Sequence, residues 1–220
     1  MSDKNTIVTV IKEQALLPLY FNADEQVSVE VLRALYRAGI RAVEYTNRGE
    51  AAFANFKAMV QVRDAEMNGL YLGIGTLKNA DEALRYHQAG ADFFISPGFV
   101  SEIAAYAVQN ELLYAPGCMT PTEIIAAETA GVTFIKLFPG NALGPDFMKS
   151  IAAVFPKLDF MPTGGVEPTV ASVGSWFNAG VCAVGMGSNL VTKALVDNRD
   201  FAGIETNTKE ILQMVQSVKG

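Results

Sequence analysis

One lysine of this chain lies in a segment that otherwise has the composition of a buried strand. Lys136 is flanked by Phe134 and Ile135 on one side and by Leu137 and Phe138 on the other. A cation among such side chains is costly to bury unless it is paired or neutralised. Desolvation lowers the pKa of a lysine, and the neutral amine can attack a carbonyl carbon to form a Schiff base. The segment therefore predicts a nucleophilic lysine; a lysine that reaches water from an edge strand is the alternative.

A glutamate on a second apolar segment is expected to face this lysine. Side chains alternate between the two faces of a strand. In segment 41–46, Val43 and Tyr45 are the better pair to pack against helices, which leaves Glu44 on the face that points inwards. A carboxylate and an amine in one dry interior can act as an acid/base group and a nucleophile. A buried structural salt bridge is the alternative interpretation.

The counts of histidine and cysteine exclude several other kinds of chemistry. His87 is the single histidine and lies in a helical pattern, so Ser-His-Asp triads and zinc sites with several histidines are not expected. Cys118 and Cys182 follow apolar runs without metal-ligand or disulfide spacing. We expect both cysteines to be reduced and buried.

Composition and charge argue against nucleic acid and membranes as partners. The 220 residues are 50% hydrophobic and carry a net charge of −6 without a basic run, so nucleic acid is not an expected partner. No apolar stretch is long enough to span a membrane, and the first residues lack the apolar region of a signal peptide. We expect a soluble, cytoplasmic protein that does not bind membranes.

Eight short apolar runs alternate with amphipathic stretches along the whole chain. Most runs are apolar throughout, as expected of parallel strands covered on both faces. They span residues 16–21, 41–46, 70–75, 92–96, 111–115, 133–138, 159–163 and 181–185. The pattern predicts one α/β domain over residues 1–220, a (β/α)8 TIM barrel with extra helices at about 5–15 and 200–218. An open doubly wound sheet is the alternative, but the glycine-rich motif that follows its first strand is absent.

In a barrel of this kind the chemistry lies at the carboxyl ends of the strands. The residues expected there are polar, glycine or proline, apart from Phe138 and Met186. They are Glu44, Arg48, Thr76, Pro97, Gly98, Pro116, Gly117, Lys136, Phe138, Thr163, Gly164, Gly165, Gly185, Met186, Gly187 and Ser188. Gly164-Gly165 and Gly187-Ser188 each precede an expected helix, whose first N–H groups could bind a phosphate. A glycine pair is also common in ordinary turns. Asn22 is expected to cap the helix after the first strand.

Seven short motifs, in order and at barrel spacing, resemble one enzyme family over nearly the whole sequence. They are VEYTNR (43–48), GIGT (73–76), ISPG (95–98), PGCMTPTE (116–123), IKLFP (135–139), PTGGV (162–166) and GMGS (185–188). Together they are similar to the class I aldolases that act on 2-keto-3-deoxy-6-phosphogluconate (KDPG) and 4-hydroxy-2-oxoglutarate (KHG). This resemblance implies a homotrimer that needs no metal or other cofactor.

The resemblance also implies roles for individual residues. Lys136 would form the Schiff base and Glu44 would be the general acid/base. The implied substrate-binding residues are Arg48 and Thr76 for the pyruvate carboxylate, Pro97, Phe138 beside the pyruvyl methyl group, and Thr163 for a hydroxyl. The implied phosphate-binding residues are Gly164, Gly165, Gly185, Gly187 and Ser188. Three residues depart from the common pattern: Leu137 replaces a phenylalanine, Met186 a glycine and Asn189 an aromatic residue, and the last two bear on substrate choice.

The expected function is the cleavage of a small-molecule 2-keto acid. KDPG would yield pyruvate and glyceraldehyde 3-phosphate, and KHG would yield pyruvate and glyoxylate. An aldolase for the related 2-keto-3-deoxy-6-phosphogalactonate is one alternative. A phosphosugar isomerase or epimerase would leave Lys136 without a role, and a non-catalytic keto-acid-binding barrel would not need Lys136, Glu44 and Arg48 together.

Overall fold

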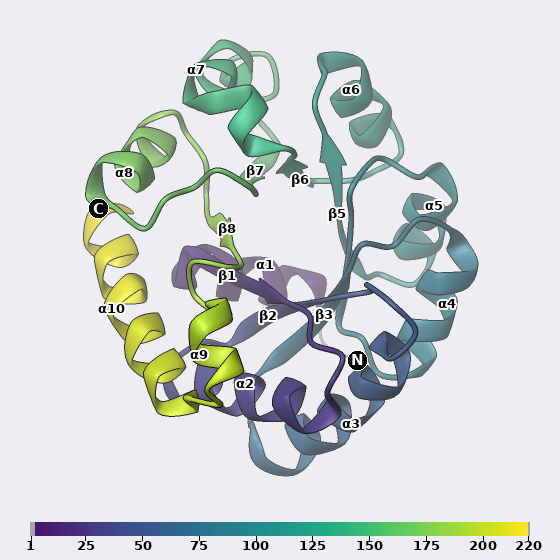
Figure 1. The fold of residues 1–220 in the computed structure, drawn as a ribbon. Coiled ribbons are helices and arrows are strands. Elements are labelled where there is room, and N and C mark those ends of the chain that lie inside the picture. The colour runs from purple at the N-terminus through teal and green to yellow at the C-terminus, as the bar shows by residue number, and fades with distance from the viewer. Residues whose placement is uncertain (1–2, 220) are drawn as a thin grey trace.

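The structure, a computed structural model, describes residues 3–219 and is a TIM barrel, as the sequence predicts (Figure 1). Its eight parallel strands are β1 (Leu16–Tyr20), β2 (Ala42–Thr46), β3 (Tyr71–Gly75), β4 (Phe93–Ser96), β5 (Leu113–Cys118), β6 (Phe134–Leu137), β7 (Asp159–Pro162) and β8 (Val184–Met186). Hydrogen bonds join them in the order β7-β6-β5-β4-β3-β2-β1-β8. A single bridge between Thr163 and Gly185 joins the last two edges, so the sheet closes on itself.

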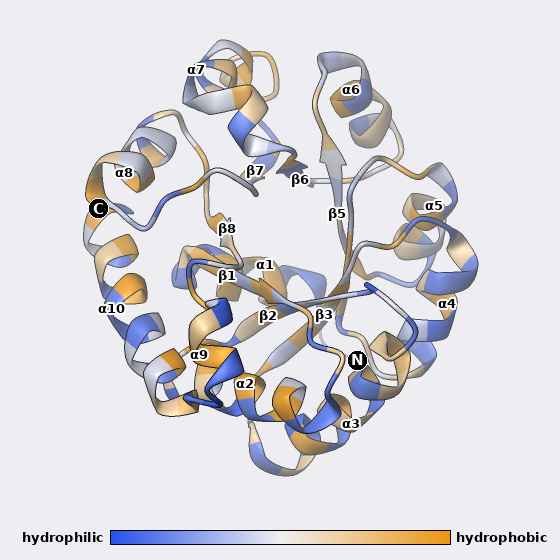
Figure 2. Cartoon of the chain, viewed as in Figure 1, coloured by the Kyte–Doolittle hydropathy of each residue, from blue (hydrophilic) through white to orange (hydrophobic). Residues whose placement is uncertain are grey.

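Helices surround the barrel, and two further helices lie at the ends of the chain, as expected. The helices are α1 (Lys4–Gln14), α2 (Glu25–Arg37), α3 (Ala52–Glu66), α4 (Ala80–Gln88), α5 (Ser101–Gln109), α6 (Pro121–Thr129), α7 (Gly140–Ala152), α8 (Val170–Asn178), α9 (Lys193–Asp197) and α10 (Phe201–Lys219). Apolar residues on these helices alternate with polar ones, so that one face of each can pack on the strands (Figure 2). Within residues 3–219, no helix is both long and apolar enough to cross a membrane.

Alternation along the strands divides the core into two clusters, as the sequence predicts. Ile135 and Leu137 of β6 belong to the cluster between the barrel and the helices. Phe134 belongs to the cluster inside the barrel. Ile7 and Ile11 of α1 join this inner cluster. Helix α1 therefore closes the amino-terminal end of the barrel and leaves the carboxyl end for chemistry.

A glutamine at the end of α1 holds this closing helix against the strands. The Gln14 side chain donates to the carbonyls of Leu16 and Ala42 and accepts from the N–H groups of Arg41 and Ala42. Because Gln14 is buried, these bonds satisfy a polar group that would otherwise be costly inside the protein.

Two local predictions about element boundaries are wrong. Pro116 and Gly117 were expected after the fifth strand, but they lie inside β5, where Pro116 pairs with Ser96 and Gly117 with Lys136. A Cβ atom at Gly117 would lie 2.2 Å from the carbonyl oxygen of Pro97, so this glycine allows a close backbone approach rather than a turn. The cap of α2 is Asp24, whose side chain accepts from the N–H of Val27, and not Asn22.

Candidate active site

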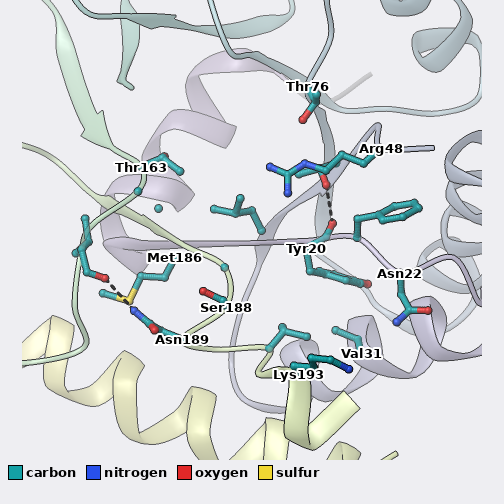
Figure 3. Close-up of a pocket in the computed structure, with 18 of the residues that line it drawn as sticks. Tyr20, Asn22, Val31, Arg48, Thr76, Thr163, Met186, Ser188, Asn189 and Lys193 are labelled. Atoms are coloured by element: carbon teal, nitrogen blue, oxygen red, sulfur yellow. Dashed lines mark hydrogen bonds between the residues drawn. The ribbon is translucent and has the colours of Figure 1, made fainter. Parts of the chain in front are cut away.

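A pocket of about 610 Å³ opens at the carboxyl ends of the strands (Figure 3). Its wall contains every catalytic, substrate-binding and phosphate-binding residue implied by the family resemblance except Glu44. These are Arg48, Thr76, Pro97, Lys136, Phe138, Thr163, Gly164, Gly165, Gly185, Gly187 and Ser188. The structure thus brings together side chains and loops from β2, β3, β4, β6, β7 and β8. Glu44 lies behind the wall, in contact with Lys136.

Lys136 and Glu44 approach one another inside the barrel from β6 and β2. The Nζ atom of Lys136 lies 3.7 Å from Oε1 of Glu44, and their side chains are 6% and 1% exposed. This distance is longer than a hydrogen bond but suits an ion pair. Both Glu44 oxygens lack a hydrogen-bond partner among residues 3–219. Both side chains therefore point inwards and converge, as strand alternation predicts.

Burial raises the pKa of the Glu44 carboxyl above its ordinary value, although the charges of Lys136 and Arg48 oppose that rise. A carboxyl with a raised pKa can hold a proton closer to neutral pH and then release it, as a general acid/base must. The position of Glu44 depends on Gly75 of β3, where a Cβ atom would lie 1.8 Å from Glu44 Oε1. Any side chain at Gly75 would therefore displace the carboxylate.

Aromatic and cationic side chains lie next to the lysine. The Phe138 ring centroid is 5.1 Å from Lys136 Nζ, close enough for a cation–π contact. Arg48 follows β2, and its guanidinium makes no hydrogen bond or ion pair with any residue in the described range 3–219. Its five N–H groups are therefore free for an anionic ligand, and the planar fork suits a carboxylate.

Thr76 has a strained backbone at the end of β3. Its φ angle is 64°, in the left-handed region that a β-branched residue rarely adopts. Its neighbour Gly75 is held in place because the Gly75 carbonyl accepts from the N–H of Asn47 at 2.8 Å. The strain therefore places the Thr76 side chain on the pocket wall near Arg48 (Figure 3).

Thr163 carries a buried hydroxyl that has no hydrogen-bond partner among residues 3–219. It follows β7 and faces Gly185 of β8, where a Cβ atom would lie 2.4 Å from the Thr163 Oγ1 atom. Gly185 itself lies inside β8 rather than in the loop after it. Buried hydroxyls usually have a hydrogen-bond partner. A buried hydroxyl that lines a pocket and lacks such a partner is therefore a candidate contact for a ligand.

The two glycine loops lie side by side and each is followed by a helix, but neither glycine pair lies at the start of its helix. After Gly164-Gly165, α8 begins at Val170. After Gly187-Ser188 the chain forms a turn, and the five-residue α9 begins only at Lys193, with Thr192 as its cap. A helix therefore follows each loop as predicted, but the first N–H groups of both helices lie beyond the glycines, because the capping side chains, Thr169 and Thr192, come further along the chain.

The N–H groups of Gly165 and Ser188 and the Ser188 hydroxyl make no hydrogen bond within residues 3–219. They are available as donors to an anion even without a helix at Ser188. Asn189 ties the two loops together, since its Nδ2 atom donates to the carbonyl of Val166 at 3.1 Å. Met186 is 2% exposed and packs in the outer core cluster, although it also borders the pocket.

Sequence reasoning missed the outer wall of the pocket. It is formed by Leu19, Tyr20, Phe21, Asn22, Val31, Thr46, Val166, Val191, Lys193, Val196 and Asp197, besides Met186 and Asn189. The carbonyl of Asn22 accepts from Tyr45 Oη at 2.8 Å, Asn55 Nδ2 at 3.0 Å and Ser28 Oγ at 3.1 Å. The outward face of β2 therefore fixes the loop after β1, through residues that form no local motif.

The remaining candidate residues lie away from the pocket. His87 Nδ1 is 2.8 Å from the Tyr106 hydroxyl, so the histidine of α4 packs against α5. Cys118 and Cys182 are free thiols, but only Cys118 is fully buried, which corrects the expectation for Cys182. Within the described range, no group of three or more His, Cys, Asp or Glu side chains is placed to hold a metal ion.

Comparison with known proteins points to one enzyme family. The sequence profile of the family described as "Aldolase: KDPG and KHG aldolase" matches residues 7–207. A 2-dehydro-3-deoxy-phosphogluconate aldolase of Pseudoalteromonas atlantica is 33% identical over 161 residues, which are 73% of each chain. A 2-dehydro-3-deoxy-6-phosphogalactonate aldolase of Escherichia coli is 31% identical over 158 residues, 71% of this chain and 75% of the relative.

A solved structure agrees with these relatives. The KDPG aldolase of Zymomonas mobilis ZM4, crystallised with 3-phosphoglycerate, superposes with a TM-score of 0.86 at 27% identity. The match covers 99% of this chain and 100% of the Zymomonas chain.

The backbone strain at Thr76 gives a test of this part of the site. Thr76→Gly should have a larger free energy of unfolding than Thr76→Ala, by about 1 kcal/mol, because glycine adopts a positive φ without strain. Urea denaturation measures the difference. The same pair of substitutions at Thr133, an exposed residue without a positive φ, should give the opposite order. An alanine variant at Thr76 as stable as the glycine variant would contradict the assigned strain.

Proposed function

Because the chain belongs to the KDPG and KHG aldolase family and is a carbon–carbon lyase, we propose that it cleaves KDPG to pyruvate and glyceraldehyde 3-phosphate through a Schiff base on Lys136. Cleavage of KHG to pyruvate and glyoxylate would be the activity on a smaller substrate. The observation that carries the proposal is the 3.7 Å approach of Lys136 and Glu44 at the inner end of the pocket. An isomerase or epimerase would leave the burial of Lys136 without an explanation.

The reaction begins at the C2 ketone of the substrate. Lys136 Nζ attacks C2 as the neutral amine, and the resulting carbinolamine loses water to give a protonated imine. This imine withdraws electrons from the neighbouring C3–C4 bond. The apolar barrel interior beneath Lys136 limits water at the nitrogen, and the Phe138 ring borders the space for the pyruvyl methyl group.

Glu44 supports the proton transfers of bond cleavage. A base removes the C4 hydroxyl proton, the C3–C4 bond breaks, and its electron pair forms an enamine of pyruvate while the aldehyde leaves. Protonation of the enamine at C3 and addition of water to the imine then release pyruvate and restore Lys136. Because Glu44 lies behind the pocket wall, we assign it this role through a bound water.

The polar groups along the pocket suit the two ends of KDPG. The free guanidinium of Arg48 and the Thr76 hydroxyl would hold the carboxylate. The orphan hydroxyl of Thr163 would contact a substrate hydroxyl. The free N–H groups of Gly165 and Ser188 would bind the phosphate. Support for this end comes from the Zymomonas enzyme crystallised with 3-phosphoglycerate.

Other parts of the proposal rest on the family alone. The relative named for 2-dehydro-3-deoxy-6-phosphogalactonate makes that C4 epimer the second candidate substrate, and Thr163 is the residue we expect to distinguish the two. The homotrimer, the cytoplasmic location and the absence of a cofactor stay predictions.

Borohydride trapping tests the covalent step. Incubation with pyruvate and borohydride should add one reduced pyruvyl group, and peptide mapping should locate it on Lys136, because this amine lies buried at the inner end of the pocket. Lys136→Ala should abolish both labelling and turnover; because it leaves Glu44 buried without its charged partner, it should also lower the free energy of unfolding, and circular dichroism checks that the variant is still folded. Labelling of another lysine, or of none, would refute the assignment.

The pH profile tests Glu44. As a base Glu44 must be ionised, and its pKa is raised, so kcat/KM should fall on the acid side at a pH above the ordinary glutamate value of 4.5. Glu44→Gln should lower turnover by roughly 10²–10⁴-fold and remove this acid limb, while trapping at Lys136 stays detectable. Near wild-type turnover in Glu44→Gln would instead indicate that Lys136 and Glu44 form a structural salt bridge.

Substrate comparison tests the phosphate end. kcat/KM should be much higher for KDPG than for KHG, because binding energy at the phosphate is used in the transition state. Inorganic phosphate should compete with KDPG, and Ser188→Ala should weaken this competition, since the Ser188 hydroxyl is free to donate. Equal efficiency on the two substrates would indicate a broad hydroxy-keto-acid aldolase without a phosphate site.

A further inference from the structure

An ion pair on α9 borders the outer part of the pocket. Lys193 and Asp197 both line it, and Lys193 Nζ lies 2.5 Å from Asp197 Oδ2. Their side chains are 86% and 57% exposed, so the pair stands in solvent at the pocket mouth. Asn22 and Val31 line the same region (Figure 3). An exposed pair one helical turn apart adds little stability, so breaking it to bind a ligand would cost little.

The backbone that carries Lys193 is held firmly. Asn207 of α10 donates from Nδ2 to the carbonyls of Asn189 and Leu190, at 2.9 and 3.0 Å. Thr192 caps α9 by accepting from the N–H of Leu195. Since Asn189 also binds the carbonyl of Val166, the base of Lys193 is fixed relative to both glycine loops.

The charges that line the pocket are unevenly placed. Its lining cations within residues 3–219 are Arg48, Lys136 and Lys193. Lys136 is paired with Glu44 inside the barrel, and Arg48 lies close enough to influence the Glu44 carboxyl. Lys193 is the first residue of α9, the element after β8, and stands five residues beyond Ser188 in the chain. It is therefore the cation available to the end of a ligand that lies away from the Schiff-base lysine.

We propose that Lys193 is a specificity residue that binds the phosphate of the substrate, and that Asp197 holds its ammonium until the phosphate displaces the carboxylate. The inference rests on the proposed aldolase function and deepens it. A phosphate carries more charge than the Asp197 carboxylate and offers three acceptor oxygens, so it can displace that group. A substrate that ends in a hydroxyl lacks this charge and cannot displace the Asp197 carboxylate, so the ion pair between Lys193 and Asp197 stays intact.

The test compares KDPG with its unphosphorylated counterpart, 2-keto-3-deoxygluconate. Lys193→Ala should lower the ratio of their kcat/KM values by about tenfold, since one charge-assisted hydrogen bond to the phosphate is lost. Asp197→Asn should raise this ratio, because it frees Lys193 and removes a carboxylate that repels the phosphate. Raising the salt concentration should reduce both effects, as the pair is exposed.

A matched control lies on another helix. Lys209 pairs with Glu205 at 2.6 Å, also one turn apart, and neither residue lines the pocket. Lys209→Ala should therefore leave the ratio unchanged. A ratio that stays constant in Lys193→Ala, or that falls in Asp197→Asn, would overturn the inference while leaving the aldolase reaction intact.

Phosphate binding can also be measured without turnover. Inorganic phosphate should raise the melting temperature of the wild-type protein and of Asp197→Asn, and should do so less in Lys193→Ala. If the protein cleaves neither substrate, the proposed function fails, and this measurement still decides the role of Lys193. Equal stabilisation of wild type and Lys193→Ala by phosphate would exclude that role.

Discussion

The placement of an amine and a carboxylate together inside an apolar barrel is the constraint on which the site depends. Lys136 and Glu44 are both almost fully buried, and either one alone would be a costly uncompensated charge. Their joint burial requires two strands on opposite walls, β6 and β2. On each strand the residue must occupy a position whose side chain points into the barrel. It also requires Gly75, since any larger residue would occupy the position of the carboxylate.

The opposite face of β2 has a separate task. Tyr45 points towards the helices, where its hydroxyl donates to the carbonyl of Asn22. Buried Asn55 and Ser28 bind the same carbonyl, so the loop after β1 is held from three elements. One strand therefore positions Glu44 on its inner face and part of the outer pocket wall through its outer face. A substitution of Tyr45 would therefore affect the site by shifting the backbone of the loop after β1, and not by removing a reacting group.

The sequence predicts the inner site well because strand alternation and the cost of burying charge are local rules. They are enough to place Lys136 and Glu44 on one inward face each. They do not predict Lys193 and Asp197 on the pocket wall, which depends on how α9 sits after the turn at Ser188. They also misplace Pro116, because proline usually marks a strand end but here lies within β5.

Because the sheet closes on itself, the same strands could follow one another along the chain from a different starting point. Strand β8 forms a ladder with β1, whereas β7 and β8 meet through the single bridge at Thr163 and Gly185. The weakest junction of the barrel therefore lies between two strands that follow one another in the chain, and the first and last strands are well joined. A circular permutant that linked the two ends of this sequence and opened the chain between β7 and β8 would keep every ladder of the sheet. Its new ends would fall at the seam, beside the glycine loop that follows β7.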